Sequence, residues 1–287
     1  MEQDEFSAFE RQGWETVAQP YHSYFGELTT QSNEALLDAL EVRAGVQFLD
    51  VASGPGYLAA AAARRGADVV GVDFADAMVQ QARRLFPALA FRSGSAEDLP
   101  FADMSFDAVG ISFGMLHFAR PDAALAEALR VLRPGGRIAF TVWASPDRTA
   151  GFGMVLKAIE KHGRMDVPLP PGPPFFRFSD SHESERALLD VGFVEPQIKE
   201  VSQTLRIRAP ETPFDVLMRG GVRVAAILKA QSPEGLASIQ KAVSDDAASY
   251  TDNGEVQIPM PCVLASARKP WMVAGNKQGP GNIAPVR

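Results

Sequence analysis

Cysteine is nearly absent from this sequence, and long apolar runs are missing altogether. Cys262 is the single cysteine among 287 residues, so no internal disulfide and no cluster of thiolate ligands can form. No stretch approaches the ~18 unbroken apolar residues that a membrane-spanning helix needs. The first residues, MEQDEFSAFERQ, are acidic and lack the apolar segment of a signal peptide. We therefore expect a cytoplasmic protein without a membrane span and without a metal site.

Positive charge is also scarce. The chain has 28 lysines and arginines against 35 acidic residues, and its formal net charge is −7 at pH 7. Nucleic-acid-binding surfaces depend on clustered lysine and arginine, so we expect no nucleic-acid partner. The hydrophobic content of 46% and the charged content of 22% are ordinary for a globular protein. The length is sufficient for one large core with a smaller annex.

Short apolar runs alternate with helical patterns between residues 46 and 143. Such alternation is typical of βαβ units and predicts a parallel sheet covered on both faces. In these sheets ligands bind beyond the C-terminal ends of the strands. Strands are expected at 46–52, 67–74, 88–95, 106–113 and 137–143, and helices at 56–66, 75–86 and 122–132, the last one broken by Pro134, Gly135 and Gly136.

The remaining chain divides into segments of different character. Residues 1–44 look helical and rich in aromatic side chains, and we expect them to cover the site. A domain over 45–270 is expected to carry insertions at 148–178 and 212–250, followed by a tail at 271–287. Within these segments we expect an irregular aromatic loop at 168–178, a helix at 181–193, a strand around 196–207, helices over 212–250 and a closing strand at 256–269.

The stretch FLDVASGPGYLAAAAARRG, residues 48–66, suits two different cofactors. Gly54, Gly56 and Ala59 fit the G-x-G-x-x-G/A fingerprint of dinucleotide-binding folds. Asp73 ends the next expected strand, where a carboxylate accepts hydrogen bonds from the ribose of either NAD or S-adenosylmethionine. Asp50 favours the second cofactor, because a carboxylate beside the helix N-terminus repels a pyrophosphate but attracts an ammonium or sulfonium group.

Four motifs in a fixed order carry a family resemblance. LDVASGPG, VVGVDFADAMVQQAR, AEDLPFADMSFDAVGISFGMLHF and ALAEALRVLRPGGRIAFTVW together resemble the class I S-adenosylmethionine-dependent methyltransferases, most of all the small-molecule branch of ubiquinone and menaquinone biosynthesis. The resemblance covers residues 45–145 closely. It implies an α/β fold, a Rossmann-like seven-stranded and mostly parallel sheet with a helical annex. It also implies in-line methyl transfer from S-adenosyl-L-methionine to a small organic acceptor, aromatic or apolar.

The same resemblance implies a set of cofactor contacts. Asp50 and the loop that contains Gly54 would hold the methionine portion, and Asp73 would accept from the ribose hydroxyls. Phe74, Met78 and residues 95–97 would surround the adenine, and residues 112–113 would border the methionine chain. Met78 could equally be ordinary helix core. The expected cofactor-binding residues are Tyr21, Asp50, Ala52, Gly54, Gly56, Asp73, Phe74, Met78, Ser95, Ala96, Glu97, Ser112 and Phe113.

Two residues depart from the family pattern. Ala52 stands where the family usually has glycine, and its methyl group is tolerable only if the backbone keeps a negative φ. Ser95 stands where the family usually has an aspartate that accepts from the adenine amino group. A serine accepts more weakly, so we expect either a lower affinity for the cofactor or a substitute acceptor in Glu97.

The acceptor side of the site rests on fewer signals. His117 follows the fourth expected strand and is a candidate general base, because histidine titrates near neutrality. The alternative is that it caps or packs the following loop. Six aromatic residues could enclose an apolar or aromatic acceptor, or could form a secondary core under the annex: Tyr21, Phe25, Trp143, Phe175, Phe176 and Phe178. Phe25, Trp143 and Phe176 are the expected substrate contacts.

Three other functions remain compatible with these residues. The fold could bind S-adenosylmethionine without catalysis, or use it for chemistry other than methylation. A nicotinamide-dependent oxidoreductase is the third, although that function leaves Asp50 and the LPF and RPGG segments unexplained.

Overall fold

The computed structural model describes residues 2–208 and 212–271. The α-helices are α1 (Glu2–Tyr24), α2 (Gly26–Thr30), α3 (Asn33–Ala39), α4 (Tyr57–Arg64), α5 (Asp76–Leu85), α6 (Pro121–Val131), α7 (Ala150–His162), α8 (Ser181–Val191), α9 (Pro213–Gly220), α10 (Arg223–Lys229) and α11 (Pro233–Ala247). Short 3-10 helices are η1 (Met115–His117), η2 (Arg177–Ser179) and η3 (Ala248–Tyr250). The strands are β1 (Gln47–Val51), β2 (Asp68–Asp73), β3 (Ala90–Ser93), β4 (Phe106–Ser112), β5 (Leu132–Trp143), β6 (Val194–Val201), β7 (Thr204–Arg208), β8 (Thr251–Asp252), β9 (Glu255–Pro259) and β10 (Cys262–Arg268).

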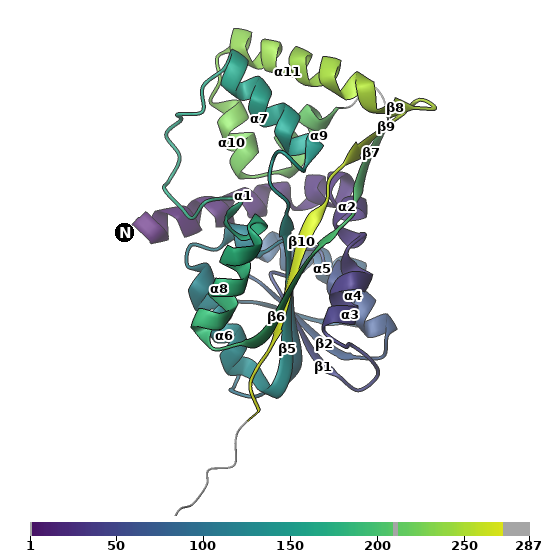
Figure 1. Cartoon of the computed structure of the whole chain (residues 1–287), viewed down its shortest axis with the longest axis vertical. Helices are drawn as coiled ribbons and strands as arrows, with labels where there is room; N and C mark the ends of the chain where they lie inside the picture. The colour runs from purple at the N-terminus through teal and green to yellow at the C-terminus, as the bar shows by residue number, and fades with distance from the viewer. Residues whose placement is uncertain (1, 209–211, 272–287) are drawn as a thin grey trace, which may run out of the picture.

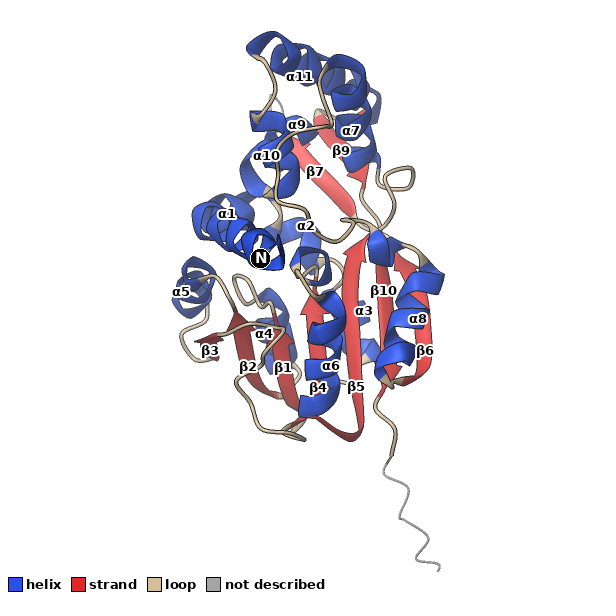
Figure 2. Cartoon of the chain, turned by 90° about the vertical axis from the view of Figure 1, so that its left-hand side faces the viewer, coloured by secondary structure: helices blue, strands red, loops and turns tan. Residues whose placement is uncertain are grey.

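A seven-stranded sheet organises the lower part of the molecule (Figure 2). Its strand order is β3-β2-β1-β4-β5-β10-β6. The pairs from β3 to β5 are parallel, whereas β10 runs antiparallel to both β5 and β6. The predicted Rossmann-like, mostly parallel seven-stranded sheet is therefore confirmed.

Helices cover both faces of this sheet. In Figure 1, α3, α4 and α5 lie on one side and α6 and α8 on the other. The central strands are apolar on both faces: Phe48, Leu49, Val109, Ile138 and Phe140 are all fully buried. This double burial is what continuous apolar runs predict, because a parallel sheet exposes neither face to water.

A second, helical lobe stands above the C-terminal ends of the parallel strands (Figure 1). It contains α7, α9, α10 and α11 together with a three-stranded antiparallel sheet of order β7-β9-β8. Helix α1 lies between the lobe and the sheet, in contact with α9 and α5. The edge where ligands bind in such sheets is therefore enclosed between two layers.

The three-stranded sheet corrects two sequence-based expectations. The single strand expected around 196–207 is two strands, β6 and β7, and the closing strand at 256–269 is likewise β9 and β10. The chain passes from one sheet to the other near Gln203, between β6 and β7, and near Pro261, between β9 and β10. At this crossing the Met260 N–H donates to the Gln203 carbonyl at 2.9 Å, and Pro261 has no N–H to continue a ladder. The expected tail lies outside the described residues, apart from Trp271.

Strand β5 begins earlier than expected. Pro134, Gly135 and Gly136 belong to the strand, which starts at Leu132 directly after α6 rather than at Arg137. Gly135 has φ +80, and the pairing of β5 with β4 shifts register over this stretch. The glycines therefore serve an irregular strand entry, a conformation that other residues adopt at a cost.

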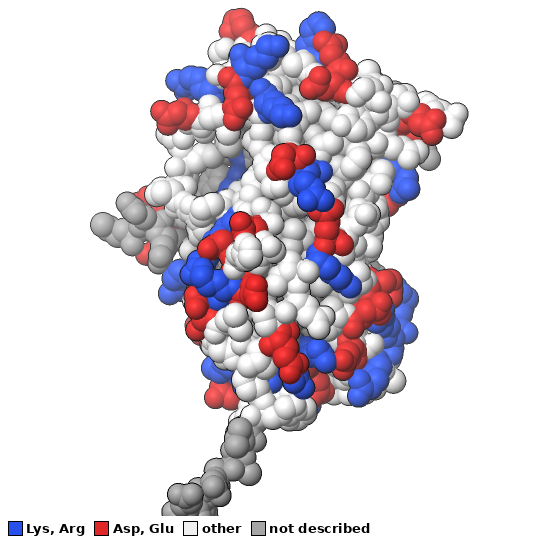
Figure 3. Space-filling model, viewed as in Figure 1, with Lys and Arg blue, Asp and Glu red and all other residues white. Residues whose placement is uncertain are grey.

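Charged side chains of both signs alternate over the face drawn in Figure 3. That face therefore presents no large area of one sign. Elsewhere in the described chain, charged side chains of opposite sign form pairs, such as Arg148 with Glu200 at 2.9 Å and Arg177 with Asp122 at 3.2 Å. Within the described part of the chain, no helix combines the length and the apolar character needed to cross a bilayer.

Candidate functional site

Three adjoining pockets lie between helix α1 and the C-terminal ends of β1, β2, β4 and β5. The inner pocket, lined among others by Ala52, Asp73 and Phe113, has about 640 Å³ of empty space. The outer pocket, lined by Phe74 and the 94–97 segment, has about 850 Å³. The aromatic pocket, lined by side chains of the sheet and of the upper lobe, has about 440 Å³. Their position matches the ligand site expected for an open α/β sheet.

The glycine loop turns the chain sharply from β1 into α4. Gly54 and Gly56 have φ +50 and +86. A Cβ on Gly56 would lie 2.6 Å from the Phe91 ring, so this glycine allows close packing, and it lines none of these three pockets. Gly54 does line the inner pocket.

Ala52 contradicts the condition derived from the sequence. Its φ is +53, in the left-handed region, although a negative φ was expected for a residue with a methyl group. An L-residue in that region costs about 1–2 kcal/mol, which the surrounding contacts must offset. The adjacent Ser53 N–H donates to the Val72 carbonyl at 3.0 Å and fixes the turn. The strand end that faces the inner and outer pockets is therefore strained.

Asp73 lies at the C-terminal end of β2 and faces both of these pockets. Its two carboxylate oxygens accept the N–H groups of Gly54 at 2.8 Å and Ala75 at 2.9 Å. Burial nevertheless raises the pKa of Asp73 to about 6. A carboxylate has further acceptor capacity beyond these two bonds, so Asp73 can also accept from hydroxyl groups in the pocket.

Asp50 is buried deeper, with 1% of its surface exposed. Its Oδ2 accepts the Ala59 N–H at 2.9 Å, while its Oδ1 has no partner. Burial, with the nearby charge of Asp73, raises the pKa of Asp50 to about 8. The hydroxyl oxygen of Ser53, beside the inner pocket, is also buried without a partner. Within the described ranges neither aspartate forms an ion pair, so the strand ends hold unbalanced acceptor groups.

The outer pocket gathers the residues expected around an adenine. Phe74, Ser95, Ala96 and Glu97 all line it, and the guanidinium of Arg11 lies 5.6 Å from the Phe74 ring. The Ser95 hydroxyl accepts the N–H of Glu97 at 3.1 Å.

Glu97 is already occupied as an acceptor. Both of its carboxylate oxygens accept from Arg120, from the backbone N–H and from Nε, each at 2.8 Å. Like Asp73, it keeps acceptor capacity beyond these two bonds, so an adenine amino group would share this carboxylate with Arg120. Met78 lines the inner pocket, not the outer one, and also packs in a small cluster with Ala18 and Ala75.

Tyr21 separates the inner pocket from the aromatic pocket. It lines both, together with Phe113, and its ring stacks on Phe25 at 5.5 Å. Burial raises the pKa of the Tyr21 hydroxyl to about 12. Ser112 and Tyr57 also line the inner pocket, and the Tyr57 hydroxyl contacts a ring nitrogen of His22.

Phe25 and Trp143 line the aromatic pocket as expected. Phe176 does not: it packs against Phe152 and Phe175 at 5.7 and 4.9 Å, one layer behind the wall. The expectation for Phe176 is therefore corrected, whereas its neighbour Phe175, also a candidate from the sequence, lines the pocket. In an irregular segment, alternation along the chain does not say which of two adjacent rings points inward.

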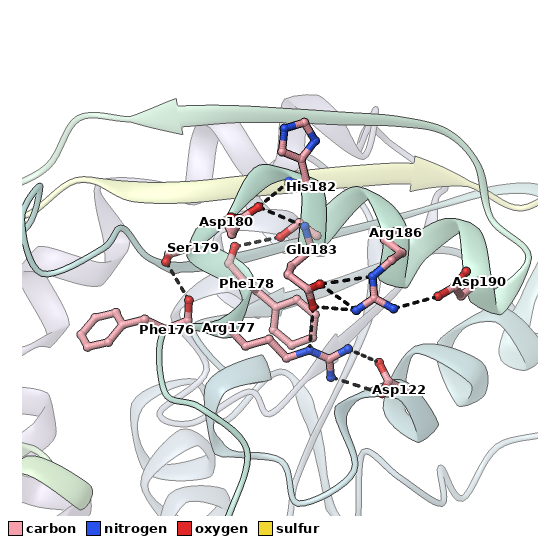
Figure 4. A network of polar contacts seen from close by, with 11 residues as sticks. Asp122, Phe176, Arg177, Phe178, Ser179, Asp180, His182, Glu183, Arg186 and Asp190 are labelled. Atoms are coloured by element: carbon pink, nitrogen blue, oxygen red, sulfur yellow. Dashed lines mark hydrogen bonds and ion pairs between the residues drawn. The ribbon is translucent and has the colours of Figure 1, made fainter.

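The loop that carries these rings is fastened by a network of charged groups (Figure 4). Arg177 lies 3.3 Å from Glu183 and 3.2 Å from Asp122, which ties the loop to α8 and α6. Asp180 caps α8 by accepting the Glu183 N–H at 3.2 Å. Exposed pairs stabilise weakly, about 0–1 kcal/mol each, whereas a capping side chain contributes about 1 kcal/mol. Together they hold Phe175 against the pocket.

His117 is the one side chain that lines all three pockets. Its Nδ1 lies 2.9 Å from Glu10 Oε2, and its ring meets Trp14 edge-on at 4.7 Å. Glu10 also accepts from Arg223 Nε at 2.7 Å. Burial alone would raise the pKa of Glu10, but the interactions with His117 and Arg223 outweigh it and lower that pKa.

Several of these residues carry no sequence signal for a site. Glu10 and Arg223 stand among other charged residues of helices, and only their partners distant in the chain reveal them. Trp14 and Phe175 belong to the aromatic-rich segments noted in the sequence, while Tyr57 directly follows the glycine loop. Across the described ranges, no group of three histidine, cysteine, aspartate or glutamate side chains is arranged to hold a metal ion.

Comparisons with known proteins agree with this geometry. Residues 49–140 match a protein family described as a methyltransferase domain. Over 112 residues the chain is 49% identical to the demethylmenaquinone methyltransferase of Beutenbergia cavernae. The aligned region covers 39% of this chain and 47% of that protein. The chain thus spans about half the length of the curated relatives it matches.

Solved structures share the fold at low identity. A SAM-dependent methyltransferase of Thermotoga maritima superposes with a TM-score of 0.54 at 18% identity, over 90% of this chain and 99% of that one. The YcgJ protein of Bacillus subtilis gives a TM-score of 0.54 at 19% identity, over 83% and 98%. Residues 49–140 therefore match a methyltransferase-domain family, within a chain that has the class I methyltransferase fold.

Proposed function

We propose that this protein is an S-adenosylmethionine-dependent methyltransferase that acts on a small aromatic or apolar acceptor. The observation that carries the proposal is the pair of buried carboxylates at the strand ends, Asp50 and Asp73, which no cation balances within the described residues. Buried charge is costly unless it is paired, so this edge of the sheet favours a cationic ligand. NAD would bring a pyrophosphate instead, and the comparisons give that alternative no support.

The residues present fit S-adenosylmethionine. The unpartnered hydroxyl oxygen of Ser53, in the wall of the inner pocket, would face its ammonium side, and Asp73 would accept from its ribose hydroxyls. Asp50 lines none of the three pockets and would act on the ammonium through its buried charge alone. Phe74, with the segment around Ser95, would enclose the adenine in the outer pocket. When bound, this cofactor supplies an electrophilic methyl group.

The aromatic pocket would hold the acceptor. Its walls are mostly rings, including Phe25, Trp143 and Phe175, which suit a flat apolar molecule better than a nucleic acid. The curated relatives are named as demethylmenaquinone methyltransferases, which points to a quinone-type ring as one acceptor class. His117 lies between this pocket and the inner one, where it would take a proton from an acidic acceptor.

Two further parts of the proposal concern the whole chain. We assign residues 1–44 to a helical cover of the site, 45–270 to the catalytic domain with insertions at 148–178 and 212–250, and 271–287 to a tail. We place the protein in the cytoplasm, because its one cysteine is buried and unpaired, as is usual in a reducing compartment.

Calorimetric titration with S-adenosylmethionine, S-adenosylhomocysteine and NAD tests the proposal. We expect both adenosyl ligands to bind and NAD to give no heat. The variant Asp73→Ala should lose at least about tenfold in affinity, about 1.4 kcal/mol, while its circular dichroism stays that of the wild type. Binding of NAD alone would overturn the proposal.

A further inference from the structure

We propose that Glu10 is a positioning residue that holds His117 in one tautomer, with the proton on Nδ1 and a bare Nε2 available to the methyl acceptor. The role of Nε2 in the reaction rests on the proposed function. The tautomer itself follows from the contacts of Glu10 alone.

Glu10 is a buried centre of polar contacts on α1. Its carboxylate is fully buried, with 0% of the side chain exposed. Arg223 Nε donates to Oε1 at 2.7 Å, and Trp14 Nε1 donates to Oε2 at 3.2 Å. His117 Nδ1 lies 2.9 Å from the same Oε2. Donors from three separate elements, α1, η1 and α10, therefore converge on one carboxylate.

The ionised carboxylate decides which nitrogen of His117 carries the proton. Glu10 accepts hydrogen bonds and donates none, so the Nδ1 that faces it must bear the hydrogen. In a neutral imidazole only one nitrogen does so, which leaves the lone pair on Nε2. Free histidine prefers the opposite tautomer, so this one has to be imposed.

The bare nitrogen is placed for proton transfer. Within the described residues, Nε2 of His117 has no hydrogen-bond partner, and 14% of the side chain is accessible. The ring lines the inner and the aromatic pockets, on the boundary between the proposed cofactor and acceptor positions. A proton taken from the acceptor would move to Nε2 and leave its electron pair on the acceptor. Glu10 would then stabilise the imidazolium, as the aspartate does in a catalytic triad.

Arg223 keeps the carboxylate from turning away. Its other N–H groups donate to the carbonyls of Pro173 at 2.8 Å and Leu116 at 2.9 Å, and its guanidinium lies 4.3 Å from the Phe6 ring. Three of its five N–H groups are thus engaged, one of them with Glu10, which holds the arginine in place. Because Glu10 belongs to α1, the orientation of His117 depends on this helix lying against the sheet.

Nitrogen NMR of the histidine rings tests the proposal on the free protein. With ¹⁵N-labelled histidine, long-range proton–nitrogen correlations distinguish a protonated ring nitrogen from a bare one. The chain has four histidines, so the loss of one set of signals in His117→Gln assigns that ring. We expect the neutral His117 ring to carry its proton on Nδ1. A neutral wild-type ring that carries its proton on Nε2 and has a bare Nδ1 would overturn the proposal without any further variant.

Two variants separate Glu10 from the general effect of anchoring α1. Glu10→Gln removes the charge and adds a donor, and we expect the Nε2-protonated tautomer to gain at least tenfold relative to the wild-type ratio. Glu15→Gln is the matched control, since Glu15 anchors α1 by accepting the N–H groups of Asp76 at 2.6 Å and Ala77 at 2.9 Å without touching His117. An unchanged tautomer in Glu10→Gln, or an equal change in Glu15→Gln, would refute the role of Glu10.

The ring measurement and the ligand titration fail independently. If the Nδ1 tautomer is found but S-adenosylmethionine does not bind, Glu10 positions His117 and the proposed function is wrong. If the cofactor binds but the ring is protonated on Nε2, the proposed function stands and the positioning role is refuted.

Discussion

The two halves of the site hold buried carboxylates in opposite electrostatic states. On the proposed cofactor side, Asp50 and Asp73 have no cationic partner in the described chain, and burial raises their pKa values to about 8 and about 6. On the proposed acceptor side, Glu10 is equally buried, but His117 and Arg223 outweigh burial and lower its pKa. The carboxylate of Glu10 therefore has its cationic partners within the protein, whereas Asp50 and Asp73 have none among the described residues.

This difference separates a scaffold from a ligand site. A buried charge with all its partners in place rigidifies the structure around it. A buried carboxylate without a partner costs stability, and a protein keeps that cost where a ligand will relieve it. The contrast thus predicts that the same kind of substitution has opposite consequences in the two halves.

Removing the paired carboxylate should have the largest effect. Glu10→Ala leaves Arg223 charged, 13% exposed and without its ion-pair partner, and it strands the donors of Trp14 and His117. Breaking a buried pair from one side costs about 3–5 kcal/mol, so we expect a loss of that size in the free energy of unfolding. Urea denaturation followed by circular dichroism measures it.

A double variant is the control for that experiment. Glu10→Met combined with Arg223→Met removes both charges, and such replacements are often neutral. The double variant should therefore be more stable than Glu10→Ala. If it were less stable, the loss in Glu10→Ala would come from packing and not from a stranded charge.

Removing the unpaired carboxylate of Asp50 should raise the free energy of unfolding, whereas removing the paired one of Glu10 should lower it. Asp50→Asn eliminates the charge while keeping an acceptor for the Ala59 N–H. At pH 8 we expect the ligand-free protein to gain about 1–3 kcal/mol, because the variant has no buried carboxyl group to ionise, and to lose at least about tenfold in affinity for S-adenosylmethionine. Thermal unfolding and calorimetry measure the two effects. Asp68→Asn, at an exposed strand start, should change stability by less than about 0.5 kcal/mol.

The gain from Asp50→Asn should depend on pH in a defined direction. In the unfolded chain an aspartate loses its proton near pH ~3.9, whereas folded Asp73 and Asp50 keep theirs to about pH 6 and about pH 8. Between these limits the folded state binds more protons, so the free energy of unfolding falls as pH rises. In Asp50→Asn the contribution of Asp50 to this decline, which extends to about pH 8, should be absent, and only the contribution of Asp73, up to about pH 6, should remain. Equal profiles for variant and wild type would contradict the assignment to Asp50.

The cofactor side was largely predictable from the sequence, and the acceptor side was not. Strand ends, the glycine loop and Asp73 follow from local periodicity and from motifs whose spacing is short. Glu10 contacts residues more than a hundred positions away, at His117 and Arg223, and nothing in MEQDEFSAFE distinguishes it from its acidic neighbours. Pairings of that kind are set by how α1 packs, which no local pattern encodes.

The same limit explains the second sheet. Residues 196–207 have a continuous β-pattern, residues 256–269 have one interrupted by Pro259 and Pro261, and each segment is expected to form one strand. The break in each is a tertiary event, where the chain leaves the seven-stranded sheet near Gln203 and Pro261 and enters the upper lobe. Periodicity identifies a strand but not the sheet to which it belongs.

The smallest expected effect concerns backbone strain on the cofactor side. Ala52 has φ +53, so Ala52→Gly should relieve left-handed strain of about 1–2 kcal/mol, reduced by the greater freedom of glycine in the unfolded chain. We expect a net gain of at most about 1 kcal/mol, measured by urea denaturation. Ala63→Gly in α4 is the matched control, since the same substitution inside a helix should lose about 0.5–1 kcal/mol. Two losses of equal size would mean that the turn at Ala52 is not strained, and the cofactor side would then differ from the acceptor side in its charges alone.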